Sequence, residues 1–238
     1  IVFGDWSSDV CSSDLVHADI TITMGLRKSV CYHPPFRPSW GEVLRINPSF
    51  PPKLLKNAPA VALLCGDEDI QLPAVSNQSY KNSRGHLGLF AGSPKYTGAP
   101  RLSARAAFHA RSGLVTLYCD KEIYSVVATE SPSVIIKSLE PDSIVSSGQL
   151  IDKHQALAAG PGWGDGREEQ LLTLLKSGLP MVLDADAISC YAKLISDHRL
   201  QVTDHGSLIL TPHPGELYRM LEILSMPLLA QETGVGST

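Results

Sequence analysis

The most informative pattern of this chain lies at residues 86–118, HLGLFAGSPKYTGAPRLSARAAFHARSGLVTLY. A short apolar strand is predicted at 86–91, and it ends in a Gly-Ser turn. An alanine-rich helix is predicted at 98–112, where apolar residues recur at every fourth position. Gly113 is a typical helix end, and 114–118 is again an apolar strand. A strand, a glycine turn, a helix and a second strand predict two parallel strands that are joined by a helix.

The same alternation continues toward the carboxyl terminus. Strands are expected at 133–136, 156–159, 180–183 and 207–210, and helices at 167–175, from Asp186 onward and after Pro214. Strands that alternate with helices form a parallel sheet that is covered by helices on both faces. The sequence therefore predicts an α/β fold with a mostly parallel sheet.

The amino-terminal region has a different pattern. Residues 16–23 alternate between apolar and polar side chains, which predicts one half-buried strand. The proline- and glycine-rich residues that follow permit at most short edge strands, such as 43–46. We interpret residues 16–57 as the last strand of a domain plus a linker, and 58–238 as a second domain. Residues 1–15 include a Ser/Asp-rich run without a period, and we interpret them as a non-native segment derived from a sequencing adapter.

The composition indicates a globular, cytoplasmic protein. Hydrophobic residues make up 43% and charged residues 18% of the 238 residues, and the formal net charge is −4. No basic cluster stands out, so a nucleic-acid partner is not expected. The longest apolar run, 58–65, is too short to cross a bilayer, and the chain has no signal-peptide pattern. The five cysteines have no CxxC pair and no metal-ligand spacing, which is typical of reduced thiols.

Four polar or glycine-rich segments directly follow predicted strands. They are residues 92–100, 160–164, 184–186 and 211–216. The carboxyl ends of parallel strands lie at one edge of a sheet, and ligands of open α/β sheets bind there. We therefore expect the four segments to meet at a common rim and to form a ligand site.

Three glycines stand at alternate positions in the second of these segments. Gly160, Gly162 and Gly164 allow the backbone to approach a phosphate or a ring, and their N–H groups can donate hydrogen bonds. The segment is not a Walker A loop, because no Gly-Lys-Ser/Thr follows. An ordinary turn is the alternative. Trp163 either stacks on a nucleotide base or covers a hydrophobic edge.

Charged side chains follow the next two strands. Asp184 and Asp186 point the same way on an extended chain, so both can serve one site, as a polar network or through Mg²⁺-bound water. For Asp186 the alternative is the N-cap of the following helix. His213 lies between two prolines before a helix N-terminus, where anions bind, and we expect it to contact a ligand. Glu216 in the first turn suits the helix dipole.

The four segments, in this order, resemble the ADP/ATP-dependent NAD(P)H-hydrate dehydratase family of the ribokinase-like fold. The matching sequences are AGSPKYTGAP (91–100), SGLV (112–115), GPGWG (160–164), LDADAI (183–188) and TPHPGE (211–216). The resemblance covers about residues 81–221, with Trp163 in place of the usual leucine and Ser189 in place of asparagine. Residues 16–28, VHADITITMGLRK, resemble the last strand of the NAD(P)H-hydrate epimerase domain that precedes the dehydratase in bifunctional bacterial enzymes.

This resemblance implies a repair activity. The family removes water from hydrated NADH or NADPH with ADP or ATP, and Mg²⁺ is expected with the nucleotide. The residues implied at the hydrate site are Ala99, Gly162, Gly164 and His213, with Ser93, Thr97, Gly98, Asp184, Asp186 and Glu216 as the supporting pocket. The parent protein is expected to be a homo-oligomer that also epimerises the hydrate and uses K⁺ for that half.

The resemblance also implies that the chain is a fragment. The family's catalytic aspartate is expected beyond Thr238, so the ribokinase-like sheet would be truncated at its carboxyl end. The 238-residue chain is therefore expected to be inactive and to fold poorly. Two alternatives remain open: a ribokinase-like kinase of a small molecule such as a vitamin precursor, and a non-catalytic module that binds a nucleotide weakly or not at all.

Overall fold

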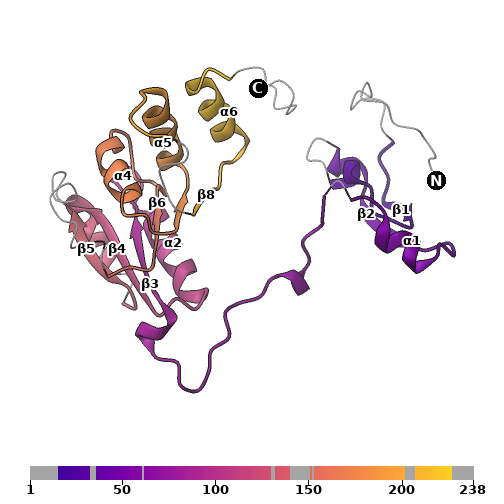
Figure 1. The fold of residues 1–238 in the computed structure, drawn as a ribbon, viewed down its shortest axis with the longest axis horizontal. Helices are drawn as coiled ribbons and strands as arrows, with labels where there is room; N and C mark the ends of the chain where they lie inside the picture. The colour runs from indigo at the N-terminus through magenta and orange to yellow at the C-terminus, as the bar shows by residue number, and fades with distance from the viewer. Residues whose placement is uncertain are drawn as a thin grey trace. The chain divides into compact units, whose positions relative to one another are not determined.

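A computed structural model describes residues 16–32, 36–60, 62–129, 132–139, 151, 153–201 and 207–226 (Figure 1). The chain divides into two compact units, Ile1–Gln71 and Leu72–Thr238. The division lies later in the chain than residue 57, where the sequence places the boundary, and the identities of the two domains stay predictions. The arm at 1–15, interpreted as non-native, lies outside the described residues.

The first unit contains a small parallel sheet and one short helix. These elements are β1 (Ile20–Met24), β2 (Glu42–Ile46) and α1 (Pro52–Asn57). β2 confirms the strand expected at 43–46, whereas β1 begins later than the strand expected from residue 16. The helix α1 was not predicted from the proline-rich sequence. Its first residue is Pro52, a position where the missing N–H of proline costs no helical hydrogen bond.

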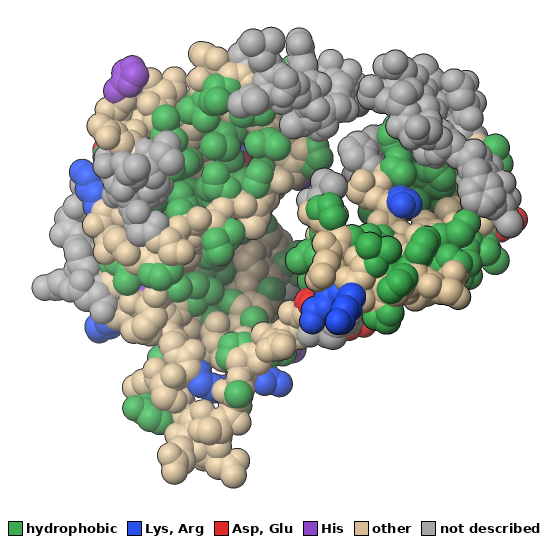
Figure 2. Space-filling model, turned by 45° about the vertical axis from the view of Figure 1, so that its right-hand side comes forward, with side chains coloured by type: hydrophobic (Ala, Val, Ile, Leu, Met, Phe, Trp, Pro, Cys, Tyr) green, Lys and Arg blue, Asp and Glu red, His purple; other side chains and the backbone are tan. Residues whose placement is uncertain are grey.

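The burial of β1 is the reverse of the expected pattern. Ile20 and Ile22, which the alternation assigns to the buried face, are 55% and 47% exposed, whereas Thr23 is only 5% exposed. The Thr23 hydroxyl can be buried because it donates to the carbonyl of Leu44 in β2, 3.3 Å away. Apolar side chains consequently lie on the surface of this unit (Figure 2).

The second unit is a six-stranded parallel sheet with the strand order β5-β4-β3-β6-β7-β8. Its strands are β3 (His86–Phe90), β4 (Leu114–Asp120), β5 (Ile135–Leu139), β6 (Ala156–Ala159), β7 (Met181–Leu183) and β8 (Leu208–Leu210). Its helices are α2 (Gly98–His109), α3 (Tyr124–Thr129), α4 (Glu168–Leu175), α5 (Asp186–Ser196) and α6 (Pro214–Ile223). Short 3₁₀ turns lie at Ser29–Tyr32, Arg37–Ser39, Asp67–Asp69, Lys81–Arg84 and Lys121–Ile123. The α/β fold is confirmed.

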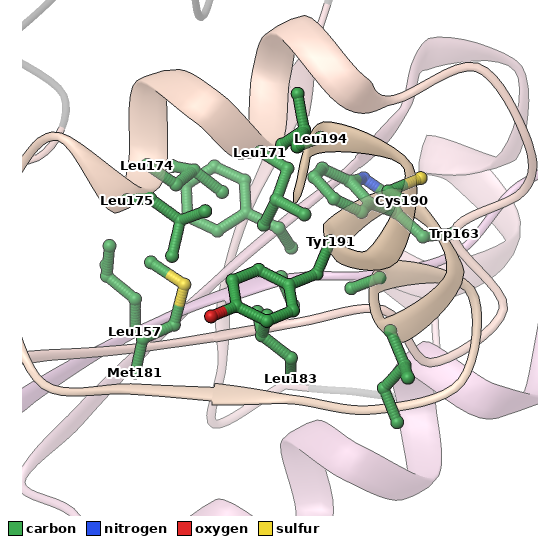
Figure 3. Packing of buried hydrophobic residues seen from close by; sticks show 14 of the residues in the cluster. Leu157, Trp163, Leu171, Leu174, Leu175, Met181, Leu183, Cys190, Tyr191 and Leu194 are labelled. Atoms are coloured by element: carbon green, nitrogen blue, oxygen red, sulfur yellow. The ribbon is translucent and has the colours of Figure 1, made fainter. Parts of the chain in front are cut away.

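Two hydrophobic cores lie on opposite faces of this sheet. Alternate residues of β3 point to opposite faces, so Leu89 packs with Ala104 of α2 and Val127 of α3, whereas Phe90 belongs to the core under α4 and α5. Figure 3 shows the second core, in which the leucines of α4 and Tyr191 of α5 lie over the strand residues. The helices α4, α5 and α6 lie side by side (Figure 1). Within the described ranges, none of the helices combines the length and apolar character that a membrane span needs.

The face under α2 and α3 is covered unevenly. One row of paired residues crosses this face from Leu117 through Leu89, Ala158 and Val182 to Ile209. The exposed fraction is 0% at Leu117 and 2% at Leu89 but 56% at Ile209. The described helices therefore cover β3 and β4 on this face and leave β8 open.

A buried histidine lies just before β6, at the amino-terminal side of the sheet. The ring of His154 packs on Gly88, where an added Cβ would lie 2.9 Å from its Cδ2, and only 4% of the residue is exposed. Its Nε2 shares a hydrogen bond of 2.9 Å with the Tyr118 hydroxyl. Burial, together with the charges of His86 and Lys137, lowers the pKa of His154 from 6.5 to about 4. The folded protein therefore keeps this ring neutral.

Stability should fall in acid because of His154. The unfolded chain protonates this histidine near its ordinary pKa of 6.5 and the folded chain only near 4, so the free energy of unfolding decreases as the pH falls between these values. The loss amounts to roughly 3 kcal/mol. Urea unfolding across this range should show a loss smaller by about 3 kcal/mol in His154→Gln.

The control is His109→Gln, which removes an exposed histidine from the end of α2 and leaves the buried ring of His154 in place. The same slope in the wild type and His154→Gln would contradict the prediction.

Candidate active site

The four predicted site segments follow four neighbouring strands. They come directly after β3, β6, β7 and β8, which are adjacent and parallel in the sheet, so all four lie at its carboxyl edge. The chain builds β3, β4 and β5 in one direction and then returns to add β6, β7 and β8 on the other side of β3. The switch point of this topology lies between β3 and β6, and ligands of open α/β sheets bind at such points. The expected common rim is confirmed.

The loops after β3 and β6 are in direct contact at the switch point. The Gly92 N–H donates to the carbonyl of Pro161 at 3.1 Å, and the Gly160 N–H donates to the carbonyl of Phe90 at 3.0 Å. Gly162 has a left-handed φ of +60°, and a Cβ added to it would lie 3.1 Å from the Cβ of Ala99. The structure thus brings Gly162 against the first turn of α2, as expected of two residues of one site.

A buried hydroxyl lies beside this contact. Ser93 is 6% exposed, and its Oγ has no hydrogen-bond partner among the described residues. A Cβ added to Gly164 would lie 3.6 Å from this oxygen. A buried hydroxyl without a partner costs about 1–3 kcal/mol, so such groups often serve a ligand. Thr97 is the N-cap residue of α2 but makes no side-chain cap bond, and Gly98 is the first residue of the helix.

Asp184 and Asp186 accept hydrogen bonds from different residues. Asp184 Oδ1 accepts a hydrogen bond of 2.9 Å from the Thr211 hydroxyl, which fixes the end of β8 to the end of β7. Asp186 Oδ2 accepts one of 2.8 Å from the Gly164 N–H. The N-cap of α5 is Ala185, so the alternative N-cap role of Asp186 is wrong. Ala185 has a φ of +46°, a left-handed conformation that costs an alanine roughly 1–2 kcal/mol and places this strain at the rim.

His213 is the N-cap residue of α6. Its Nδ1 accepts a hydrogen bond of 3.1 Å from the Gly215 N–H, and its Nε2 lies 3.2 Å from Glu216 Oε1. The other oxygen of Glu216 accepts from the His213 N–H at 3.0 Å, which completes a capping box. Glu216 therefore orients the imidazole as well as the helix end. The His213 side chain is 67% exposed, so its ring lies open at the rim.

Contacts join the predicted site residues into separate groups rather than into one cluster. One continuous group contains Ala99 and Gly162, together with Ser93, Gly164 and Asp186. Asp184 joins the next loop through Thr211. His213 and Glu216 contact each other and follow that threonine in the chain.

Trp163 does not stack on a ligand. It is 2% exposed and packs in the core (Figure 3). Its ring centroid lies 6.4 Å from that of Phe90. Of its two alternatives, nucleotide stacking is wrong and hydrophobic packing is confirmed. Sequence reasoning missed Arg167 and Asp120, whose side chains form an ion pair of 2.6 Å at the same rim. The position of Asp120 at the end of a predicted strand was the available signal.

Alanine substitutions at Gly162 and Gly166 distinguish the cost of backbone strain from the cost of a steric clash between two loops. Gly162 and Gly166 both have left-handed φ values, +60° and +75°, so alanine strains either by roughly 1 kcal/mol. A Cβ at 162 would lie 2.5 Å from the Cβ of Tyr96, whereas one at 166 meets nothing within 4 Å. We expect Gly162→Ala to lose about 2 kcal/mol more unfolding free energy in urea than Gly166→Ala. Equal losses would mean that the two loops are not in contact.

Comparisons with known proteins agree with the resemblance noted in the sequence. A bifunctional NAD(P)H-hydrate repair enzyme of Moorella thermoacetica is 35% identical over 164 residues, which cover 63% of this chain and 30% of that protein. The crystal structure of the ADP/ATP-dependent NAD(P)H-hydrate dehydratase from Bacillus subtilis, co-crystallised with ATP/Mg²⁺, has a TM-score of 0.56 at 26% identity and covers 68% of this chain and 56% of that one.

The fold has a further neighbour, a ribokinase-like superfamily protein of Enterococcus faecalis, with a TM-score of 0.54 at 22% identity over 70% of this chain and 60% of that one. The chain spans 30% of the Moorella enzyme and 52% of a dehydratase from Ciona intestinalis. A family model described as NAD(P)H-hydrate dehydratase matches residues 87–235, which include all four rim segments. The chain therefore belongs to the NAD(P)H-hydrate dehydratase family.

Proposed function

We propose that this rim binds hydrated NADH or NADPH, and that the whole protein removes water from it with ADP or ATP. One observation carries the proposal: at the switch point, Gly162 contacts the first turn of α2 beside the Ser93 hydroxyl, which has no hydrogen-bond partner in the described part of the chain. The first N–H groups of an α-helix have no acceptor within the helix and form its positive end. Such a corner suits the phosphates of a dinucleotide.

The residues have distinct roles in this proposal. Ala99 and Gly162 would donate backbone hydrogen bonds to the hydrate, and Gly164 would leave space beside Ser93. His213 would contact the substrate from the opposite side of the rim, with its Nε2 held by Glu216. Asp184 and Asp186 would keep the loops in place.

The reaction is an elimination. The C–O bond of the ring hydroxyl breaks, and a neighbouring ring carbon loses a proton. The double bond of the dihydropyridine forms again between these two carbons. Transfer of a phosphoryl group from the nucleotide to this hydroxyl would make phosphate the leaving group. Among the described residues, no three His, Cys, Asp or Glu side chains lie where they could hold a metal ion. Mg²⁺ would therefore be held chiefly by the phosphates of the nucleotide.

Other parts of the proposal concern the whole protein. Its amino-terminal unit would be the end of an epimerase domain that uses K⁺, which agrees with the bifunctional relative and with the apolar residues that this unit exposes. We also propose a homo-oligomer and a location in the cytoplasm, where the unpaired thiols of buried Cys119 and Cys190 would stay reduced.

The activity can be assayed directly. The protein encoded by the uninterrupted reading frame around this sequence should restore the absorbance of NADH or NADPH from the hydrate when ADP or ATP is added.

No turnover with either nucleotide would overturn the proposal. A stable phosphorylated product from a vitamin precursor would favour the kinase alternative.

His213→Asn tests whether the imidazole contacts the substrate. Asparagine is a good N-cap and should keep the free energy of unfolding within about 0.5 kcal/mol of the wild type. The loss of the imidazole contact with the substrate should lower kcat/KM for the hydrate by about 10-fold. Unchanged kinetics in a stable variant would restrict His213 to capping α6.

A further inference from the structure

One peptide group in the glycine loop is held from both sides by charged side chains. The carbonyl of Trp163 accepts a hydrogen bond of 3.2 Å from Arg167 Nε. The N–H of the same peptide, on Gly164, donates to Asp186 Oδ2 at 2.8 Å. A cation thus fixes one end of the peptide dipole and an anion fixes the other.

Arg167 is itself fixed by a third element. Its Nη2 lies 2.8 Å from Oδ1 and 2.6 Å from Oδ2 of Asp120, the last residue of β4. The two side chains are only 15% and 20% exposed, and Arg167 Nη1 also donates to Gln170 Oε1 at 3.4 Å. The planar guanidinium can hold a carbonyl and a carboxylate at once, which an ammonium group cannot do with the same geometry. Arg167 therefore connects the loop after β6 to the end of β4.

The orientation of this peptide matters for the site. The buried indole of Trp163 anchors one side of it, but Gly164, with a φ of +82°, imposes little restraint on the other. Rotation of the peptide would exchange its carbonyl and N–H beside Ser93, where we place the substrate. The charged partners must therefore select one of the two orientations.

We propose that Arg167, backed by Asp120, is a positioning residue that sets the orientation of the Trp163–Gly164 peptide for substrate. The kinetic part of this inference rests on the function proposed above; the structural part does not.

The chain offers a matched control ion pair at the first turn of α4. Arg199 Nη2 lies 2.6 Å from Glu169 Oε1 of α4, the same length as the Arg167–Asp120 pair. These side chains are 37% and 66% exposed and have no described contact with the glycine loop. Arg199→Met therefore removes an ion pair of the same kind without altering the loop.

Hydrogen exchange of the Gly164 amide in the whole protein tests the structural part. Arg167→Met should speed this exchange by about 10-fold or more, because the released carbonyl lets the peptide rotate away from Asp186. Arg167→Lys should give an intermediate rate, and Arg199→Met the wild-type rate. If Arg167→Met does not fold, Asp120→Asn/Arg167→Met removes both charges and leaves none unpaired. Wild-type exchange in a folded Arg167 variant would overturn the proposal.

Kinetics of the whole protein test the consequence for substrate. Misplacement of a positioning loop should lower kcat for hydrate dehydration by about 100-fold and change KM by less than about 3-fold. A lower melting temperature with normal kcat would mean a merely structural role and would also overturn it. If the wild type itself does not dehydrate the hydrate, the proposed function fails, and the exchange rates still decide whether Arg167 holds the peptide.

Discussion

Backbone lies against backbone where the loop after β6 passes the ends of β3 and β7, and the rim depends on this close approach. A Cβ added to Gly160 would lie 1.7 Å from the carbonyl oxygen of Asp184. The Gly92 N–H donates to the carbonyl of Pro161 at 3.1 Å, and a Cβ added to Gly92 would lie 2.7 Å from the ring of Pro100. Both glycines have left-handed φ values, +123° and +89°. No other residue type permits this conformation and this distance together. The strand ends can therefore lie this close together only because Gly160 and Gly92 have no side chains.

Side chains from one strand end hold the loop of another across the rim. Thr211 bonds to Asp184, the Gly164 N–H bonds to Asp186, and Arg167 reaches Asp120. Each bond joins two different loops, so the rim is held by connections between segments that are far apart in sequence. Charge-assisted bonds of this kind are stronger than neutral ones. This arrangement supports a site whose loops stay in place before substrate binds.

The sequence predicted the parts of the structure that have a strong local signal. The bounds of β6, the start of α5 and the common rim agree with the expectations, because apolar runs, helix starts and parallel topology are all local or general rules. The six-residue helix α3 was missed because it contains β-branched residues that favour strands. The reversed burial of β1 and the pairing of Arg167 with Asp120 depend on tertiary neighbours, which periodicity does not reveal.

The switch point also has a kinetic consequence. β3, β4 and β5 pair with neighbours in sequence. After β5 the chain must return past β4 to pair β6 with β3, where Ala156 aligns with Leu87. Closing such a long loop is slow compared with pairing nearby strands. The part of the sheet made of β3, β4 and β5 can therefore form first. It contains neither Asp184 and Asp186 nor the loop with the three glycines at 160, 162 and 164. Ligand recognition would then arise late in folding, at the moment when the second half-sheet docks, and a ligand added early would have nothing to bind.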